Sequence, residues 1–492
     1  PLGPDAANPV ADHVESLVMG VRDMHLACRD ARFRAVLLRA LRGWRGLPQR
    51  VVLRATRIYG LTLANAMSPA SLTSANTRAM HLERLARSSL LIGQREPHWL
   101  VYRAELQDLE NGDIPFFEHA LGSNVVQGAV GPIEGLVVGD AIDAATRRIT
   151  EIDDDDLRWQ EGLVRGSVLA RMLTTDQAQP ARGAITGPPA EAAVVAADLL
   201  QAITAAVVPR AHNPTWLALS RLPDGRKLRL GLVGDGWYDG RLGIAATLQY
   251  GHLRALAAAT SAPVVRTLEQ SLPYVRWRYL RNLGLGYNGV GGILRWLRLN
   301  TGEQARNVLA RRLLVELIET LPRQFVGMDR VHDMIGGVGG LLGPLAQTLR
   351  EHPDVAGWDL LELATEHLLA AQETDGGWRG QLSARPLTGL AHGAAGAGLA
   401  LIEAGTALQR PDVVDAGARA FAYEASVYDG QHANWPDFRE GSAPVMTAWC
   451  HGAPGIGLTR MRALQLTPAH RDAPRWREDL AVAMTTTATD PI

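Results

Sequence analysis

The sequence predicts a mainly α-helical protein whose second half is an α/α toroid, in which outer helices surround a ring of inner ones. Three observations predict this fold: helix-like apolar runs, a glycine motif that recurs along the chain, and little of the alternation typical of strands. The chain has 492 residues, of which 47% are hydrophobic and 21% charged, as in globular proteins. This length suggests roughly three domains at about 150 residues each.

The first part, from residue 12 to about residue 173, has helical stretches separated by polar turns. The acidic run at residues 153–156 is typical of a helix start on the protein surface. Residues 174–191 combine Pro, Gly, Thr and Gln without periodicity. We therefore place a domain boundary there: residues 1–175 form the first domain, 176–191 a linker and 192–492 the second domain.

The second part contains five G-x-x-G steps, each followed by an apolar helix-like run. Their first glycines are Gly240, Gly289, Gly337, Gly393 and Gly452. The spacings of 49, 48, 56 and 59 residues fit two helices and their connections. Each step lets an inner helix begin where its backbone passes close to a neighbour, because glycine has no Cβ. Residues 216–234 are an exception and predict a short β-hairpin.

The repeat also predicts its own continuation. One more repeat of about 50 residues would put a sixth glycine step near position 502. That position lies beyond Ile492, so we expect the ring to be incomplete at its C-terminus and its final repeats to be missing from this sequence.

Charge and cysteine content narrow the function classes. Fifty basic and 51 acidic residues give a net charge of -1, which favours neither nucleic acid nor anionic membranes. The longest apolar runs, residues 192–209 and 391–408, are Ala-rich and interrupted by acids, so we expect buried helices and no membrane insertion. Two cysteines, Cys28 and Cys450, cannot form a disulfide framework. With no signal peptide at the start, they indicate a cytoplasmic protein.

Motifs in both parts of the chain match those of one enzyme family. The second part contains GLAHGAAGAGLAL (389–401), ANWPDFR (433–439), TAWCHGAPGIGLTR (447–460), WYDGRLGIA and HDMIGGVGG. The first part contains QRVVLRATRIYG (49–60), ELQDLENGDIPFFEH (105–119) and DDDLRWQEGLVRGSVL (154–169). The chain therefore resembles the class II lanthipeptide synthetases (LanM type), in which a dehydratase region precedes a LanC-like cyclase domain.

The resemblance implies an enzyme that modifies a ribosomal precursor peptide consisting of a leader and a core. Ser and Thr are phosphorylated, phosphate is eliminated, and Cys thiols add to the new double bonds to form (methyl)lanthionine thioether rings. The first part would then be the α-rich end of a kinase-like dehydratase, and the second would be the cyclase. Zn²⁺ is the implied cofactor of the cyclase, and ATP and Mg²⁺ those of the full-length enzyme. Since the family's kinase residues precede the matching segment, we expect truncation at both ends.

The resemblance makes Cys450 a zinc ligand. A catalytic zinc takes three protein ligands and keeps an open position, where a substrate thiol can bind and lose its proton. In the family the other two ligands are a Cys-His pair in a later glycine step, expected here beyond Ile492; the adjacent His451 is a further candidate. An isolated cysteine is otherwise more often a small buried apolar residue.

His392 and Asp333 are the candidate proton-transfer residues. His392 matches the family histidine near the zinc, and an imidazole can protonate the enolate formed by thiol addition or help to remove the thiol proton. Asp333 matches an acidic residue of the same cavity that could orient His392. Helix capping is the alternative role for both residues.

Arg50, Arg54 and Thr56 are the candidate residues of phosphate elimination. Arg50 and Thr56 match the family arginine and threonine, and Arg54 lies between them. Elimination requires donors that stabilise the departing phosphate. The two arginines would share one face of a helix, whereas all three residues would share one side of a strand. Without the resemblance, a solvated basic face is the plainer interpretation.

Two other functions remain open. One is a non-catalytic peptide-binding remnant of such an enzyme, with an incomplete zinc site. The other is an α/α toroid of the terpenoid- or glycan-processing kind. The second predicts paired carboxylates in the cavity, and the cysteine motif argues against it.

Overall fold

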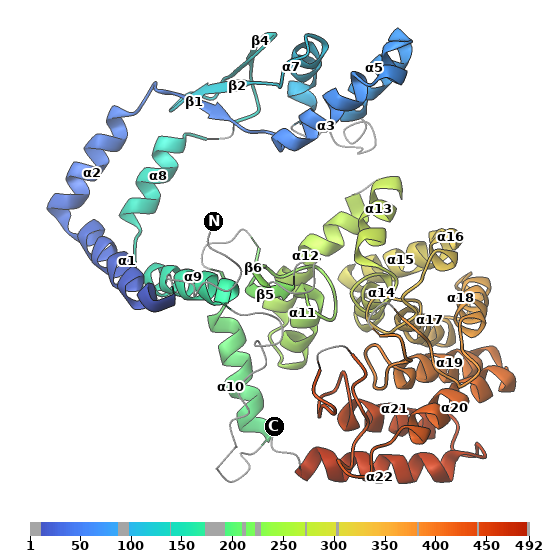
Figure 1. Ribbon diagram of the computed structural model, residues 1–492. Coiled ribbons are helices and arrows are strands. Elements are labelled where there is room, and N and C mark those ends of the chain that lie inside the picture. Colours follow the sequence, from blue (N-terminus) through green and yellow to red (C-terminus); the bar gives the residue numbers. More distant parts are fainter. Residues whose placement is uncertain are drawn as a thin grey trace. The chain divides into compact units, whose positions relative to one another are not determined.

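Helices make up most of the protein, and the predicted mainly α fold class is confirmed (Figure 1). The structure, a computed structural model, describes residues 11–86, 98–137, 139–172, 192–208, 213–221, 228–270, 273–301, 305–380, 383–439 and 442–489. The chain divides into two compact units. The first holds residues 1–172 and 270–275, and the second holds residues 173–269 and 276–492. Among the described helices, none is long and apolar enough to cross a membrane.

The first unit combines helices with a small antiparallel sheet. Its elements are η1 (Ala11–His13), α1 (Val14–Arg29), α2 (Ala31–Gly43), β1 (Pro48–Val51), α3 (Thr56–Ala66), α4 (Pro69–Leu72), α5 (Ala75–Glu83), η2 (Arg84–Ala86), α7 (His98–Glu110), β2 (Phe117–Ala120), β3 (Val126–Gly128), β4 (Gly131–Ile133), α8 (Ala141–Thr150) and α9 (Asp154–Met172), where η marks a 3₁₀ turn. Helix α9 begins in the acidic run, as predicted. Residues 173–191, which include the predicted linker, lie outside the described residues, so the domain boundaries stay a prediction.

Helix α7 links the two small cores of the first unit. The sheet order is β1-β2-β3-β4, with Pro48 opposite Ala120 and Val51 opposite Phe117. Buried side chains of α7 pack against Phe117 and the other inward residues of the sheet. Leu109, near the end of α7, packs with residues of α3 and α5 instead. The sequence analysis missed this sheet.

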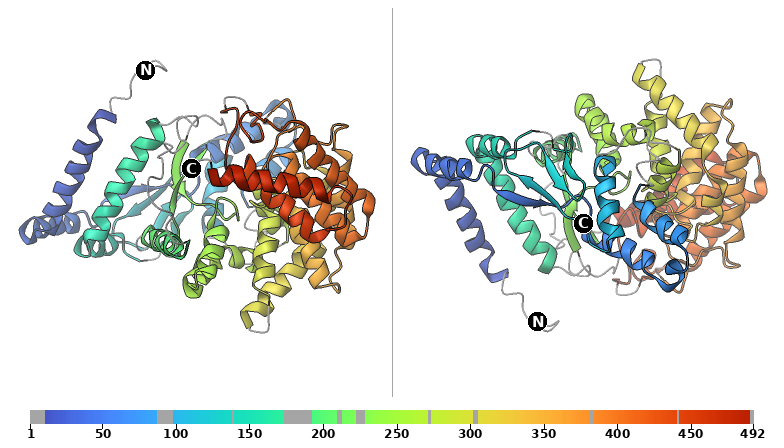
Figure 2. Two further views of the ribbon diagram at one scale, coloured as in Figure 1. Left: turned by 90° about the horizontal axis from the view of Figure 1, so that it is seen from below. Right: turned by 90° about the horizontal axis from the view of Figure 1, so that it is seen from above.

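The second unit contains the repeats. Its elements are α10 (Ala192–Ala205), β5 (Leu217–Arg221), β6 (Leu228–Leu232), α11 (Arg241–Tyr250), α12 (Arg254–Gln270), α13 (Pro273–Leu283), α14 (Val290–Leu299), α15 (Ala305–Thr320), α16 (Arg323–Gly327), α17 (Gly339–Glu351), α18 (Trp358–Ala370), α19 (Ala394–Leu408), α20 (Pro411–Ser426), α21 (Ala453–Leu466) and α22 (Ala473–Thr489). Strands β5 and β6 form the predicted hairpin. Helices α11, α14, α17, α19 and α21 begin at the glycine steps and contact one another in that order. From α14 on, each packs on the helix that follows it, α15, α18, α20 or α22 (Figure 2).

The loops that lead into the inner helices are joined by backbone hydrogen bonds. The N–H of Trp237 donates to the carbonyl of Tyr287, Tyr287 to Met334, Met334 to Ala391, and Ala391 to Cys450, over 2.9–3.1 Å. One continuous row of hydrogen bonds therefore crosses all five repeats. Residues at these loops lie side by side although they are far apart in the sequence.

The second glycine of every step lies against a backbone oxygen of the loop before it. A methyl group added at Gly243, Gly292, Gly340, Gly396 or Gly455 would lie 2.0–2.1 Å from the oxygen of Trp237, Tyr287, Met334, Leu390 or Trp449, respectively. Such a distance is far shorter than a carbon–oxygen contact allows, so each position needs glycine. This close approach explains why the glycine pattern marks the inner helices.

We predict that Gly340→Ala destabilises the second unit by at least the roughly 1–3 kcal/mol typical of overpacked cores. Its added methyl would meet the Met334 oxygen at 2.0 Å and the Cα of Gly286, in the neighbouring repeat, at 2.8 Å. Urea denaturation measures the change. Gly327→Ala is the matched control, because nothing lies within 4 Å of its added methyl and an alanine there should stabilise the helix by about 0.4–1 kcal/mol. Equal midpoints for the two variants would contradict the prediction.

Candidate active site

Three neighbouring inner loops bring the predicted cyclase residues together. Asp333 lies before α17, His392 before α19, and Cys450 and His451 before α21. The row of backbone hydrogen bonds runs through the residues next to them. The stacking of repeats therefore joins groups from three separate parts of the chain in one site.

Asp333 is held through both of its carboxylate oxygens. Oδ1 accepts hydrogen bonds from the N–H groups of Ile335, Gly336 and Gly337 at 3.0, 2.8 and 3.2 Å. Oδ2 lies 2.5 Å from Nδ1 of His392. The residue therefore holds the turn at residues 335–337 and makes the expected contact to His392. The helix-capping alternative is wrong, because neither Asp333 nor His392 caps the helix that follows it. Only 8% of Asp333 is exposed, which leaves the carboxylate little freedom to move.

The contact with Asp333 determines which nitrogen of His392 is available. The contact occupies Nδ1 of His392, so Nε2 is the ring nitrogen left to face another partner. The His392 side chain is 25% exposed. Together with Asp333, His332 and Trp378, it lines a pocket of about 240 Å³. Asp333 and His392 thus form a closely paired carboxylate and imidazole at a cavity.

Cys450 and His451 lie beside this pair. The rings of His451 and His392 are stacked, with centroids 5.9 Å apart. Burial lowers the pKa of His451 to about 4, so its ring is neutral near pH 7. Its Nδ1 is buried and has no hydrogen-bond partner among the described residues. A thiol next to a neutral imidazole is a donor pair that suits zinc.

A fixed arginine contributes positive charge near the thiol. Burial raises the pKa of the Cys450 thiol, while the Arg439 guanidinium opposes that shift. Arg439 is held by Asp437, with Nε 3.0 Å from Oδ1 and Nη2 2.5 Å from Oδ2. The charge of Arg439 therefore favours the thiolate in a site that is otherwise poor for it.

Buried polar side chains hold the loops that carry His392 and Cys450. Oε1 of Glu424 accepts hydrogen bonds from Gly389 N–H at 2.7 Å and Ala395 N–H at 2.9 Å. Oε2 of Glu424 lies 3.0 Å from Nη1 of Arg460, and neither of these two residues has any exposed surface.

Asn434 holds the next loop in the same way. Its Oδ1 accepts a hydrogen bond from Ala453 N–H at 2.9 Å, and its Nδ2 donates to Thr447 Oγ1 at 2.9 Å. The segment between these contacts contains Cys450. Glu424 on an outer helix and Asn434 in the connection that carries Cys450 thus hold the backbone next to the candidate residues.

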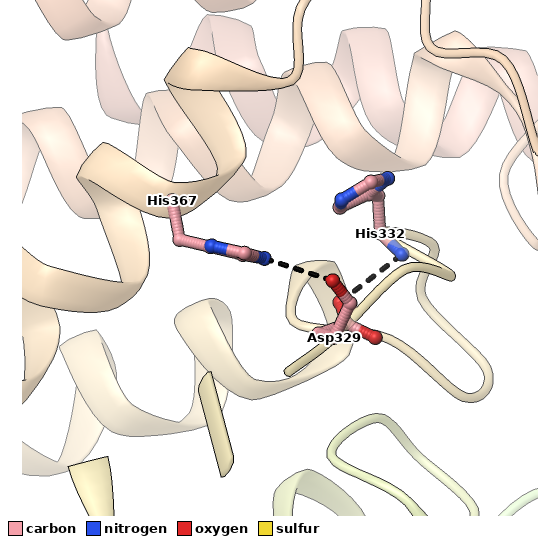
Figure 3. Close-up of side chains that lie close together, drawn as sticks. All are labelled: Asp329, His332 and His367. Carbon is pink, nitrogen blue, oxygen red and sulfur yellow. Dashed lines mark hydrogen bonds between the residues drawn. The ribbon is translucent and has the colours of Figure 1, made fainter. Parts of the chain in front are cut away.

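A second group of ligand-type side chains includes His332, which lines the same pocket as Asp333 and His392. Asp329, His332 and His367 each offer one ligand atom, and these atoms lie within 4.8 Å of one another (Figure 3). Of the described residues, they form the one group of three or more His, Cys, Asp or Glu side chains with that geometry. The sequence analysis named none of the three.

The candidate elimination residues of the first unit lie around the end of β1. Arg50 is exposed on β1, 5.6 Å from the ring centroid of Phe116, and Thr56 is exposed at the start of α3. The segment from Arg50 to Thr56 is a strand end, a turn and a helix start. The three residues therefore share neither one face of a helix nor one side of a strand. In the part of the chain that the structure describes, no hydrogen bond joins Arg50, Arg54 and Thr56 to one another.

The interpretation of these arginines as a solvated basic face is wrong for Arg54, whose side chain is only 11% exposed. Its Nε donates to Oε1 of Glu105 at 2.7 Å, and the Tyr59 hydroxyl donates to the same oxygen at 2.7 Å. Glu105 is fully buried. Burial and the hydrogen bond to Glu105 raise the pKa of Tyr59, so it stays protonated and remains a donor.

The sequence analysis gave no role to Asp437, Arg439, Asn434 or Glu424. The first three stand in the quoted motif ANWPDFR, which was the signal that could have found them. Glu424 lies on an outer helix outside any quoted motif, and only the fold brings it to the His392 loop.

Comparisons with known proteins give the following matches. A family model described as lanthionine synthetase C-like protein matches residues 232–491, and one described as a domain of unknown function, DUF4135, matches residues 2–120. A solved structure described as nisin cyclase is 19% identical, with a TM-score of 0.34, over 50% of this chain and 68% of that chain. No curated protein matches this chain.

The helical repeats define an α/α toroid that holds a His-Asp pair beside a cysteine. The first family model covers more than half of the chain, and the chain belongs to the lanthionine synthetase C-like family. With the DUF4135 region before it, the chain has the organisation of a class II synthetase of the LanM type, and that resemblance is confirmed.

Proposed function

We propose that this protein closes thioether rings in a precursor peptide by adding Cys thiols to dehydrated Ser and Thr residues. The observation that carries the proposal is the 2.5 Å contact between Asp333 and Nδ1 of His392, on loops adjacent to the one with Cys450. This arrangement orients a base next to a position suited to a thiol. The precursor, with its leader and core, is the proposed partner, and the proposed location is the cytoplasm.

The chemistry requires two proton movements. The substrate thiol loses its proton, and its sulfur forms a bond to the β-carbon of the dehydroamino acid. The electron pair of the double bond moves to the α-carbon, and the resulting enolate takes up a proton there. Nε2 of His392 is suited to deliver that proton once the ring is protonated, because Asp333 then stabilises the imidazolium. Arg439 favours the thiolate through its charge.

Cys450 and His451 offer donor types that a zinc ion takes. Cys450 offers a sulfur, and the buried Nδ1 of His451 lacks a partner among the described residues. Zinc, when bound, would lower the pKa of a substrate thiol at its open position. The described residues at this point supply two candidate donors, whereas a catalytic zinc takes three. We propose Cys450 as one ligand and keep His451 as the second candidate.

For the first unit we propose participation in dehydration, through phosphorylation and then phosphate elimination. The match to DUF4135 over residues 2–120 includes Arg50, Arg54 and Thr56. Arginine and a hydroxyl are suitable donors for a departing phosphate. ATP and Mg²⁺ would serve the phosphorylation step in the full-length enzyme.

The test uses the protein with a synthetic peptide that carries one dehydroalanine and one cysteine. Ring closure consumes the thiol without changing the peptide mass, so alkylation followed by mass spectrometry counts the thiols that remain. We expect faster thiol loss than in buffer, and a return to the buffer rate with Cys450→Ala. Zinc content of the complete gene product should fall in the same variant. Thiol loss at the buffer rate with the unmodified protein, together with equal zinc in both proteins, would favour the peptide-binding remnant instead.

A further inference from the structure

The cluster of Asp329, His332 and His367 is built from two separate elements of the second unit. Asp329 and His332 lie in the connection between α16 and α17, and His367 lies on α18. Figure 3 shows both histidine side chains beside Asp329, and the two imidazole centroids are 5.6 Å apart. Packing of an inner loop against an outer helix thus brings two imidazoles and a carboxylate together.

The turn that carries His332 is fixed in an unusual conformation. Oδ2 of Asp329 accepts hydrogen bonds from His332 N–H at 3.1 Å and Val338 N–H at 2.8 Å, and its Oδ1 accepts one from Val331 N–H at 3.1 Å. His332 has φ of 62°, in the left-handed region that a non-glycine residue adopts at a cost. Such strain is found where the surroundings require a side chain in one place.

A purely structural role explains only part of the cluster. Asp329 caps its turn, and Nε2 of His367 lies 3.1 Å from the backbone oxygen of Asp329. Neither contact involves Nδ1 of His332, which is buried without a hydrogen-bond partner among the described residues. Buried polar atoms normally have a hydrogen-bond partner, so the structural role does not explain why this nitrogen is buried without one.

We propose that Asp329, His332 and His367 form a binding site for a divalent metal ion of the Zn²⁺ class, separate from Cys450. Two imidazole nitrogens and one carboxylate oxygen are a ligand set that such ions prefer. An ion bound through Nδ1 of His332 would give that nitrogen the partner it lacks among the described residues. If His367 ligates through Nε2, its ring proton moves to Nδ1 and the hydrogen bond to the Asp329 oxygen is exchanged for the metal bond. This site goes beyond the proposed function and does not rest on it.

The site also has a structural consequence. His332 directly precedes Asp333, whose carboxylate holds His392. An ion bound by His332 and by His367 of α18 would tie this loop to the outer helix. It would therefore reinforce the loop from which the proposed catalytic pair is oriented.

The test measures Zn²⁺ and Co²⁺ binding by the chain after removal of metal with a chelator. All variants carry Cys450→Ala, which removes the thiol site. We expect Cys450→Ala to bind one ion per chain, and the double variants with His332→Ala or His367→Gln to lose it. Gln at position 367 retains an N–H donor for the Asp329 oxygen, so loss of metal cannot be attributed to that hydrogen bond. Bound Co²⁺ should lack a sulfur-to-cobalt charge-transfer band.

The matched control is His432→Ala in the same background. His432 also contacts a carboxylate, with Nδ1 2.7 Å from Oδ2 of Asp429, but it is not part of the three-ligand cluster. Its removal should leave the ion bound. The proposal is overturned if Cys450→Ala binds no stoichiometric metal, or if the ion persists in both double variants. Circular dichroism of each variant verifies that the helices remain. Metal binding and ring closure are measured separately, so failure of the metal site would leave the result of the peptide assay unchanged.

Discussion

Replacing His392 by asparagine should slow ring closure by about 10²–10⁴-fold, the usual contribution of a general acid or base. Asparagine retains a donor for Oδ2 of Asp333, which in the native protein lies 2.5 Å from Nδ1 of His392. It cannot transfer a proton near neutral pH. The expected result is therefore a loss of turnover with little change in peptide binding or stability. Thiol alkylation of the dehydroalanine peptide measures the rate, and titration of the same peptide measures its affinity.

His432→Asn is the matched control for this variant. His432 makes the same kind of contact, with Nδ1 2.7 Å from Oδ2 of Asp429, but its side chain is 43% exposed and it lies outside the pocket. The control should close rings at the native rate. A His392→Asn protein that keeps the native rate would exclude His392 from proton transfer, whatever the role of Cys450.

Glu424→Ala should lower the free energy of unfolding of the second unit by about 3–5 kcal/mol, the cost of breaking a buried ion pair from one side. The substitution leaves the buried Arg460 with one carboxylate fewer. It also removes the acceptor of Gly389 N–H and Ala395 N–H, which flank His392. Urea denaturation, followed by a probe in the second unit, measures the stability. Amide hydrogen exchange at Gly389 and Ala395 should accelerate.

Asp354→Ala provides the comparison for an exposed pair. Asp354 pairs with Arg311 at 2.9 Å, with 67% and 40% of the two side chains exposed. Such pairs contribute roughly 0–1 kcal/mol, so the loss should be small. If Glu424→Ala were no more destabilising than Asp354→Ala, the buried pair would not hold the His392 loop as described.

The repeat architecture could be predicted from the sequence because its cause is local. Each inner helix starts at a position where a side chain would collide with a backbone oxygen, as at Gly340 and Gly455. Glycine therefore recurs at a spacing that can be read directly. The acidic start of α9 and the β5–β6 hairpin also depend on short stretches of sequence.

Features that depend on tertiary contacts could not be predicted in this way. Strands β1–β4 have three or four residues each, which is too short for a clear alternation. Arg54 is paired with Glu105, which lies 51 residues away, so no local pattern reveals the pair. The same holds for the contact of Glu424 with the His392 loop. Asp333 and His392 were named through the resemblance, and their catalytic roles stay predictions.

The row of hydrogen bonds across the inner loops fixes the starts of the inner helices relative to one another. The connections that lead into these loops are not part of that row over most of their length. At the second glycine of each step, the inner helices leave no room for an added methyl group. The longest stretches between glycine steps, 56 and 59 residues, end in the connections that precede α19 and α21. These connections supply Trp378 to the pocket and Arg439 to the surroundings of the thiol. His392 and Cys450 stand near the ends of these same connections, where the row of hydrogen bonds runs. Substitutions earlier in a connection, as at Trp378, can therefore reshape the pocket while these ends keep their backbone contacts.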